Sequence, residues 1–444
     1  MKKIFVFIFS LLLFVCTSFS LQKSIFNSEG IKWQTPLRLS DSTHIQFDYS
    51  MLSIITQEHI IFPYVESTMD TTVPIKDANN INVYVRKFKN GILSNAINLT
   101  NSIYNSSHPI IKTDKNGITH LIWGQSFLTP SSSSYINPKD IYYSFYNNGI
   151  WSSPENIFHL DSLKSLTAYR ASKLEIDSQN RLHLLWKGEN KLTGEHFYHK
   201  VEQNFTWSET KEILFRTADY DFIFDKNDRM HMVYFRPELS GGYDENSVYY
   251  RYSDNYGESW SDSVLVHKSG SQNAIRAQLF IDQKNKIHII WTKNLSGLKV
   301  AAETIYHSFS SDGVTWNQPK AITPQVLDGT LYFSAAIDKN DKIHLVYDLR
   351  KGFGQLPVKL CYTYWDGTNW SVPEEILTDA QMPAIEIDNS NFLHLVFADG
   401  MKGYKYYTRT TTPLITRVDE KKITFRTNMS YIKIFRIHSI RQQP

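Results

Sequence analysis

The sequence predicts an all-β fold in which seven four-stranded units follow one another around a closed ring. Three observations lead to this prediction: a composition rich in Tyr, Phe, Ile and Thr, a hairpin motif that recurs seven times, and an N-terminal segment that supplies a strand missing from the last copy. Of the 444 residues, 14% are aromatic and only 20% are charged, which excludes a disordered chain. The formal net charge of +3 argues against nucleic acid as a partner.

Residues 1–20 are predicted to form a signal peptide that is cleaved before Leu21. Lys2 and Lys3 precede an apolar run at residues 4–15, and the small residues Ser18 and Ser20 occupy the positions before the cut. The run is too short to span a bilayer comfortably, and no other segment is long and apolar enough to do so. We therefore expect an exported protein, secreted or at the cell surface, without a transmembrane segment.

The central motif is an Asp followed six residues later by His and three residues after that by an aromatic residue. Its Asp residues are Asp114, Asp177, Asp225, Asp282, Asp338 and Asp388. The matching histidines are His120, His183, His231, His288, His344 and His394. A weaker first copy has His59 and Phe62 but carries Ser53 in place of Asp, so seven of the 15 histidines share one repeated position.

The spacing predicts four strands per unit, A to D in chain order. Three residues after each Asp lies a residue type that tolerates a left-handed backbone, which indicates a tight A–B turn: Gly117, Asn180, Asp228, Asn285, Asp341 and Asn391. A second element follows the third strand and carries Trp151, Trp207, Trp260, Trp316 or Trp370, with Leu93 in the first unit. Units of four strands at a period of about 56 residues indicate the blades of a β-propeller.

The two ends of the repeat predict how the ring closes. The last copy, around His394, lacks a Trp element, whereas residues 31–36 resemble residues 314–319 and supply one with Trp33. The N-terminal strand is therefore expected to complete the last blade and remove the free edges. We predict a seven-bladed β-propeller over residues 21–411. Residues 412–444 are predicted to form a short C-terminal β tail, either an extra hairpin or a sorting-domain remnant, with a loosely ordered end as the alternative.

One turn of the repeat resembles a known family motif. Residues 253–260, Ser-Asp-Asn-Tyr-Gly-Glu-Ser-Trp, resemble the Asp box (Ser-x-Asp-x-Gly-x-Thr-Trp) of the sialidase-like, bacterial-neuraminidase-repeat superfamily of β-propellers, with Asn255 where Asp is usual. Residues 310–316 look like a shortened second copy. The resemblance covers about residues 31–411 and implies the fold more than an activity, because an Asp box stabilises a turn.

No catalytic residue is carried over from that family. Sialidases are six-bladed and need an arginine triad, a Tyr–Glu pair, an Asp and an early Phe/Tyr-Arg-Ile-Pro motif. Residues 235–237, Phe-Arg-Pro, lack the Ile and lie in the fourth blade. Seven-bladed polysaccharide lyases also belong to the superfamily, and their His, Tyr and Arg motifs have no close match in this chain.

The repeated Asp and His are predicted to be structural, because a catalytic group is normally singular. No cofactor is indicated and no metal site: the A–B turns that start at Asp114 and Asp225 with Asp-Lys-Asn lack the distal Glu of a calcium loop. His196 and His199 lie three apart on a strand and so face opposite sides. Cys361 is the only cysteine outside the predicted signal peptide, so no internal disulfide is expected.

Candidate ligand-binding residues are sought on the face opposite the repeated turns, where the B–C and D–A connections lie and do not repeat. The residues chosen there are Arg170, Arg276, Arg236, Tyr169, Tyr332, Asp219 and His108. Guanidinium groups beside tyrosines suit an acidic sugar or a carboxylate-bearing peptide. Alternatively, each Arg pairs with a neighbouring acid and only lines the channel.

Three functions remain open at this point. The first is an exported, monomeric propeller that binds glycan, acidic glycan included, or protein ligands on this loop face. The second is a glycan-active enzyme, a sialidase-like glycosidase or a polysaccharide lyase, and the third is a cell-surface scaffold for protein interactions. Whether the protein is catalytic, and which ligand it binds, does not follow from the sequence.

Overall fold

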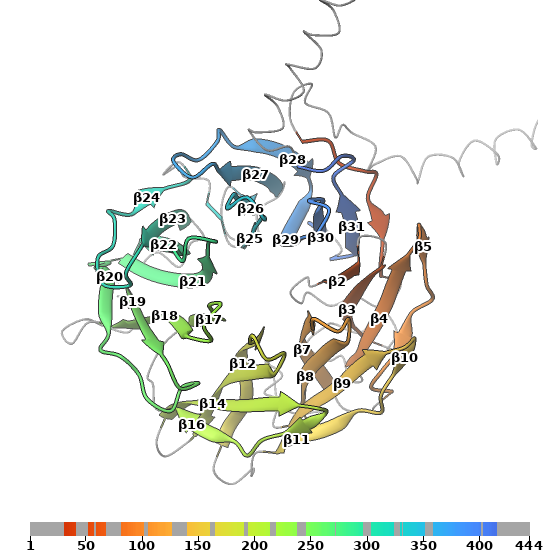
Figure 1. The fold of residues 1–444 in the computed structure, drawn as a ribbon. Helices are drawn as coiled ribbons and strands as arrows, with labels where there is room; N and C mark the ends of the chain where they lie inside the picture. The colour runs from red at the N-terminus through yellow and green to blue at the C-terminus, as the bar shows by residue number, and fades with distance from the viewer. Residues whose placement is uncertain are drawn as a thin grey trace, which may run out of the picture.

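Seven β-sheets are arranged around a central axis in the computed structural model of the protein (Figure 1). The structure describes residues 31–40, 52–56, 59–67, 81–101, 105–126, 140–159, 165–190, 194–213, 219–237, 246–270, 272–295, 303–323, 329–330, 332–350, 358–400 and 403–414. Among these residues the regular structure is entirely β, so the predicted seven-bladed, all-β propeller is confirmed. The predicted signal peptide lies outside the described residues, as does the tail from residue 415 on.

Each sheet is one blade, numbered here from the N-terminus, with its first strand nearest the axis. Blade 1 holds β2 (Ser53–Thr56), β3 (His59–Ser67), β4 (Ile81–Lys89), β5 (Ile92–Leu93) and β6 (Ile97–Asn98). Blade 2 holds β7 (Asn105–Thr113), β8 (Thr119–Ser126), β9 (Asp140–Asn147), β10 (Ile150–Trp151) and β11 (Glu155–His159). Blade 3 holds β12 (Ser165–Ile176), β13 (Leu182–Asn190), β14 (Gly194–Gln203), β15 (Thr206–Trp207) and β16 (Lys211–Ile213).

The remaining four blades have four strands each. Blade 4 holds β17 (Tyr220–Phe224), β18 (Met230–Pro237), β19 (Asn246–Ser253) and β20 (Val264–His267). Blade 5 holds β21 (Gln272–Ile281), β22 (Ile287–Leu295), β23 (Glu303–Ser310) and β24 (Lys320–Ala321). Blade 6 holds β25 (Phe333–Ile337), β26 (Ile343–Leu349), β27 (Lys359–Trp365) and β28 (Glu374–Thr378). Blade 7 holds β29 (Ala380–Ile387), β30 (Leu393–Asp399), β31 (Lys405–Arg409) and β1 (Leu37–Arg38).

The outermost strand differs in detail from the prediction. In blades 1 to 3 it is split into two short pieces that both pair with the third strand, for example β10 and β11 with β9. Trp151 and Trp207 lie in the first of these pieces, whereas Trp260 and Trp316 precede the outer strand of their blades. The outer strand of a blade packs on only one neighbour, so its pairing tolerates interruption better than the inner strands do.

The outer strand of blade 7 comes from the other end of the chain. β1 pairs antiparallel with β31, with Leu37 opposite Tyr407, and Trp33 forms a bridge to Thr410. Trp33 is only 6% exposed and packs with Leu393 and Tyr406 of blade 7. The first and last described segments of the chain thus share one sheet.

The A–B turns have the conformation that the sequence predicts. Asn180, Asp228, Asn285, Asp341 and Asn391 all have φ between 62° and 67°, in the left-handed region. The carboxylate of each repeated Asp accepts backbone N–H groups of its own turn, as Asp388 does from Ser390 (2.9 Å) and Phe392 (2.8 Å). The repeated Asp is therefore a turn-closing residue.

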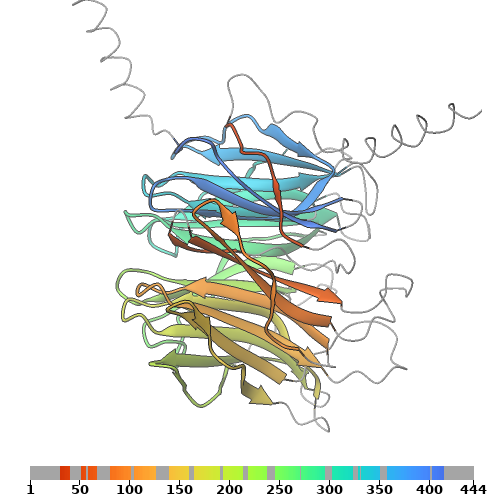
Figure 2. The same ribbon diagram turned by 90° about the vertical axis from the view of Figure 1, so that its right-hand side faces the viewer.

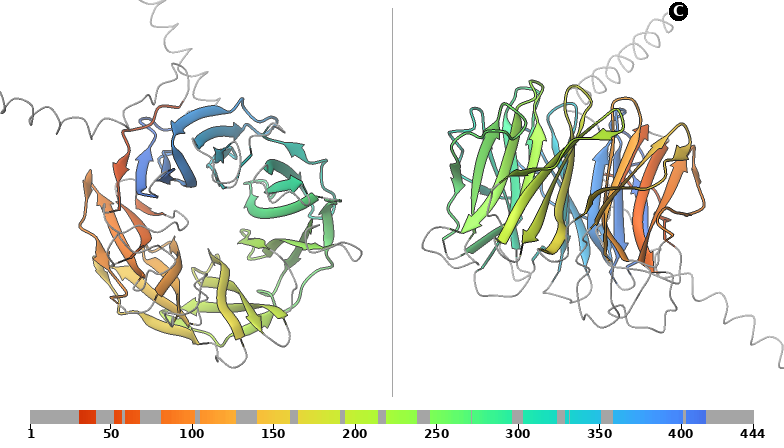
Figure 3. Two further views of the ribbon diagram at one scale, coloured as in Figure 1. Left: turned by 180° about the vertical axis from the view of Figure 1, so that it is seen from behind. Right: turned by 90° about the horizontal axis from the view of Figure 1, so that it is seen from below.

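The hydrophobic core lies between neighbouring blades. Val248 and Tyr250 of blade 4 pack against Ile289 and Trp291 of blade 5, and the same arrangement recurs around the ring. Side views show the blades stacked around the axis with the A–B and C–D turns on one face, which we call the turn face; the opposite face is the loop face (Figures 2 and 3). Among the described residues no helix is long and apolar enough to span a membrane.

Candidate functional site

The repeated histidines make the contacts expected of structural residues. Nε2 of His394 lies 3.2 Å from Oδ2 of Asp388, and its Nδ1 lies 2.9 Å from the hydroxyl of Tyr407 on the neighbouring strand. The same pair of partners surrounds His120, His231 and His344. Each of these histidines is buried within its own blade, which leaves the search for a ligand site to residues that do not repeat.

Three of the predicted site residues come together where the inner strands of blades 4, 5 and 6 begin. The backbone N–H of Arg276 donates to Oδ2 of Asp219 at 3.0 Å, and the guanidinium carbon of Arg276 lies 5.1 Å from the centre of the Tyr332 ring. Burial raises the pKa of Asp219, while the attraction of Lys173 opposes that rise. Neighbouring blades thus contribute an acid, a guanidinium group and an aromatic ring to one place.

A second arginine contacts the same aromatic ring. The guanidinium carbon of Arg350 lies 5.8 Å from the centre of the Tyr332 ring, and Arg350 forms a buried ion pair with Asp348. Asp348 also accepts the backbone N–H of Tyr332 at 2.9 Å and the hydroxyl of Thr330 at 3.1 Å. We call Asp219, Arg276, Tyr332, Asp348 and Arg350 the Tyr332 cluster. Its two arginines and two acids balance in formal charge.

The backbone at Arg276 is strained. Arg276 has φ of 53° and lies at a β-bulge, where the register of β21 against β22 shifts between Ile275 and Ala277. The corresponding bulges of blades 2 and 7 hold His108 (φ 51°) and Met382 (φ 54°). Non-glycine residues in this region cost about 1–3 kcal/mol and persist where the surrounding structure holds them, often at functional sites.

The other predicted site residues do not join the Tyr332 cluster through the contacts described. His108 lies at its own bulge in β7, and the exposed Arg236 stacks on Tyr249 of its own blade at 4.2 Å. The backbone of Arg170 pairs with Lys187 in blade 3, but the side chains of Tyr169 and Arg170 lie outside the described residues. Their role in ligand binding stays a prediction.

Sequence reasoning missed a belt of polar side chains that links every blade to the next along the inner strands. Charged links join Lys112 to Glu175 at 2.8 Å and Lys173 to Asp221 at 3.1 Å. The other links are Ser53 to Thr113, Asp221 to the N–H of Leu279, Gln278 to the N–H of Ala335, Ser334 to the N–H of Ile385, and Glu386 to the N–H of Ile54. The available signal was the presence of charges in strands otherwise rich in apolar residues.

Burial and ion pairing within the belt shift the pKa values of its charged side chains. Burial raises the pKa of Glu386 to about 7, although the nearby Lys112 opposes the rise. Burial lowers the pKa of Lys112, but the ion pair with Glu175 outweighs it and holds that pKa above its usual value. Among the described residues no group of three or more His, Cys, Asp or Glu side chains is placed to hold a metal ion.

Comparison with known proteins shows the fold alone. No family model and no curated protein matches the chain. An ulvan lyase of a polysaccharide lyase family, solved bound to -[GlcA(1-4)Rha3S]-, matches with a TM-score of 0.58 and 11% identity over 87% of this chain and 99% of that one. A protein of unknown function from Dyadobacter fermentans matches with a TM-score of 0.52 and 14% identity over 69% of this chain and 94% of that one. The chain therefore shares its overall fold with these two structures, and that fold is the seven-bladed β-propeller that the sequence predicted.

Proposed function

We propose that the protein is an exported β-propeller that binds glycans on its loop face, with Arg276 and Tyr332 as the central contacts. The observation that carries the proposal is the strained bulge at Arg276, which directs a guanidinium group over an aromatic ring where three blades meet. A guanidinium group can donate two parallel hydrogen bonds to a carboxylate or sulfate, and an aromatic ring can pack against the apolar face of a sugar.

Two further observations support a glycan ligand. The N-terminal 20 residues have the pattern of a cleaved signal peptide, which suits a protein that meets extracellular polysaccharides. The ulvan lyase of similar fold was solved with a saccharide that contains GlcA, a uronic acid. Because Asp219 and Asp348 balance the two arginines, we expect the acidic group of the ligand to be recognised by directed hydrogen bonds rather than by net charge.

The test separates a binding role for Arg276 from a structural one. Glycine adopts a positive φ without strain, so Arg276→Gly should leave the protein at least as stable while it removes the guanidinium group. Binding of acidic oligosaccharides on a glycan array, followed by calorimetry on the strongest, should then weaken by about tenfold or more, which corresponds to about 1.4 kcal/mol.

Met382→Gly is the matched control, because it makes the same change at the equivalent bulge of blade 7. It should leave glycan affinity unchanged. Loss of stability in Arg276→Gly with unchanged affinity would show that Arg276 only lines the channel.

The enzyme alternative is supported by the same structural likeness to a polysaccharide lyase. Incubation of the purified protein with acidic polysaccharides, with reducing ends and unsaturated products measured, tests it directly. Product formation that Arg276→Gly abolishes would convert the proposed binding site into an active site.

A further inference from the structure

A cavity of about 660 Å³ lies between blades 3 and 4 on the turn face, opposite the Tyr332 cluster. Its walls come from β13 and β14 of blade 3 and from the turn that follows β19 in blade 4. Arg181, His183, His199, Trp207 and Tyr256 are among the side chains that line it. The volume is in the range of about 300–1,000 Å³ that small-molecule sites occupy.

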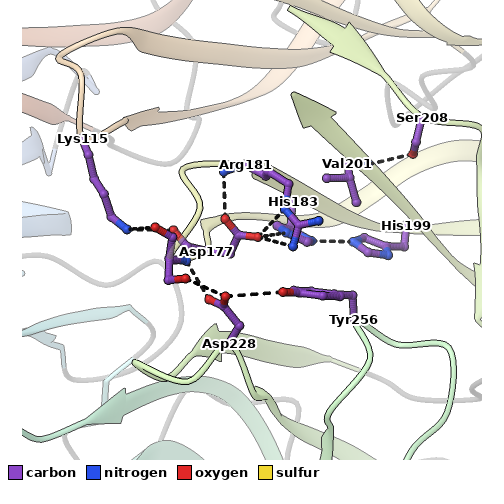
Figure 4. Close-up of polar contacts among 10 residues, drawn as sticks. Lys115, Asp177, Arg181, His183, His199, Val201, Ser208, Asp228 and Tyr256 are labelled. Atoms are coloured by element: carbon purple, nitrogen blue, oxygen red, sulfur yellow. Dashed lines mark hydrogen bonds and ion pairs between the residues drawn. The ribbon is translucent and has the colours of Figure 1, made fainter. Parts of the chain in front are cut away.

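A chain of hydrogen bonds leads from the interior of blade 3 to this cavity (Figure 4). Oδ2 of Asp177 lies 3.2 Å from Nε2 of His183, and Nδ1 of His183 lies 3.0 Å from Nε2 of His199. Burial raises the pKa of Asp177, but hydrogen bonds from His183 and from the backbone of Arg181 outweigh this and hold it at about 2. The carboxylate is therefore ionised and can only accept hydrogen bonds. His183 must therefore donate through Nε2.

The positions of the ring protons on His183 and His199 follow because both imidazole rings are neutral. Burial lowers the pKa of His183 below its usual value and that of His199 to about 3. A neutral His183 that donates through Nε2 accepts at Nδ1, so His199 must donate through its own Nε2. Nδ1 of His199 is then an acceptor, and no described residue donates a hydrogen bond to it.

Blade 5 contains the same pair of histidines in a closed setting. Nδ1 of His288 lies 3.1 Å from Nε2 of His307, and the indole N–H of Trp370, from the next blade, donates to Nδ1 of His307 at 3.3 Å. The ring of Trp365 also packs edge-on against His307 at 4.9 Å. The acceptor nitrogen that faces the cavity in blade 3 is thus occupied by an indole N–H in blade 5.

The turn of blade 4 explains why blade 3 stays open. It has six residues between Ser253 and Trp260, whereas the turn of blade 6 that closes the pair in blade 5 has four between Trp365, the equivalent of Ser253, and Trp370. The turn places the ring of Tyr256 over His183 at 5.6 Å, while Trp260 packs with the core around Ile213. The cavity is therefore a feature of this blade pair rather than a by-product of the repeat.

The charges around the cavity are already compensated. Arg181 pairs with Asp177, and Lys211 pairs with Glu258, each at 2.6 Å. Asp254 pairs with Arg229 at 2.7 Å. A ligand would therefore meet both hydrogen-bond donors and acceptors but no uncompensated charge, and the amide of the exposed Gln203 is one of these polar groups. It would also meet the aromatic rings of Trp207 and Tyr256.

We propose that this cavity is a second saccharide site, specific for neutral sugars, in which a ligand hydroxyl donates to Nδ1 of His199. Hydroxyl groups both donate and accept, as the balanced lining requires, and the apolar face of a sugar ring can pack on the aromatic side chains. The hydroxyl takes the place that the indole N–H of Trp370 has in blade 5. The site is independent of the glycan site proposed on the loop face.

The test replaces His199 by the residue that most other blades carry at the same position. In blades 2, 4, 6 and 7 the residue equivalent to His199 is a Tyr, whose hydroxyl lies 2.6–2.9 Å from the repeated His. His199→Tyr should keep that bond to His183 and remove the acceptor nitrogen from the cavity. His307→Tyr makes the same change in the closed pair of blade 5 and is the matched control. Gln203→Ala, at the exposed rim, is a second variant that does not touch the buried pair.

The full-length protein and the three variants are titrated by calorimetry with neutral gluco-, xylo-, manno- and arabino-oligosaccharides, and melting is recorded for each. We expect at least one neutral oligosaccharide to bind, with affinity lowered about tenfold by His199→Tyr, lowered by Gln203→Ala and unchanged by His307→Tyr. If none of these neutral oligosaccharides binds, or if Gln203→Ala and a folded His199→Tyr both bind normally, the proposal is wrong. Arg276→Gly should leave this binding intact, which separates it from the loop-face site.

Discussion

Replacement of His394 by Leu removes two buried hydrogen bonds while it keeps an apolar side chain of similar size. The bonds join Nε2 to Asp388 at 3.2 Å and Nδ1 to the hydroxyl of Tyr407 at 2.9 Å, and His394 is fully buried. Each bond contributes about 1 kcal/mol net, and a buried hydroxyl left without a partner costs about 1–3 kcal/mol. His394→Leu should therefore lower the free energy of unfolding by about 2–4 kcal/mol.

Urea unfolding followed by tryptophan fluorescence measures this change. A double-mutant cycle with Tyr407→Phe should show a coupling of about 1 kcal/mol, which isolates the bond to the hydroxyl. His288→Leu is the comparison, because Nε2 of His288 lies 3.7 Å from Asp282, beyond hydrogen-bond distance. His288→Leu should therefore lower the free energy of unfolding by about 1 kcal/mol less than His394→Leu does. An unchanged unfolding curve for His394→Leu, with glycan binding lost instead, would refute the structural role of the repeated histidines.

Three further predictions concern the belt, the end strand and the turns. Because the folded pKa of Glu386 is raised to about 7 from 4.5, its carboxylate destabilises the fold progressively as pH rises between these values. Glu386→Gln should have the same free energy of unfolding as the natural protein near pH 4, and one higher by up to about 3 kcal/mol above pH 7. Urea unfolding at several pH values across this range measures the difference. A difference that is the same at every pH would contradict the prediction. Deletion of residues 1–40 removes Trp33 and β1 and should lower the melting temperature and expose an edge that aggregates, whereas deletion of residues 1–30 should do neither. Asn285→Ala should cost about 1 kcal/mol of stability because of the φ of 62°, and Asn285→Gly should cost less; equal losses would show that the backbone conformation is not the cause.

The sequence alone was enough to predict the seven-bladed ring, because the information for it is local and repeated. An Asp, a residue tolerant of a left-handed backbone and a buried His at fixed spacing specify one hairpin, and seven copies specify the number of blades. The likeness of residues 31–36 to residues 314–319 pointed to Trp33 as the partner of the last blade for the same reason.

The arrangement of side chains between blades was decided only in the tertiary structure. Sequence reasoning singled out Arg276, Tyr332 and Asp219. It did not predict that Arg276 and Arg350 both approach the ring of Tyr332, because these residues come from different stretches of the chain. The inner belt was missed for that reason too: Lys112 and Glu175 are 63 residues apart and meet only when blades 2 and 3 pack together.

The two histidine pairs show most clearly which features the sequence alone does not predict. His183 with His199 and His288 with His307 follow the same local pattern, yet one pair opens to a cavity and the other is closed by Trp370. The difference arises from the turn of the next blade, which has two more residues in blade 4 than in blade 6, so that a different aromatic side chain reaches the pair. Hydrogen bonds within a hairpin are set by spacing along the chain, whereas a binding site between blades depends on contacts that only packing creates.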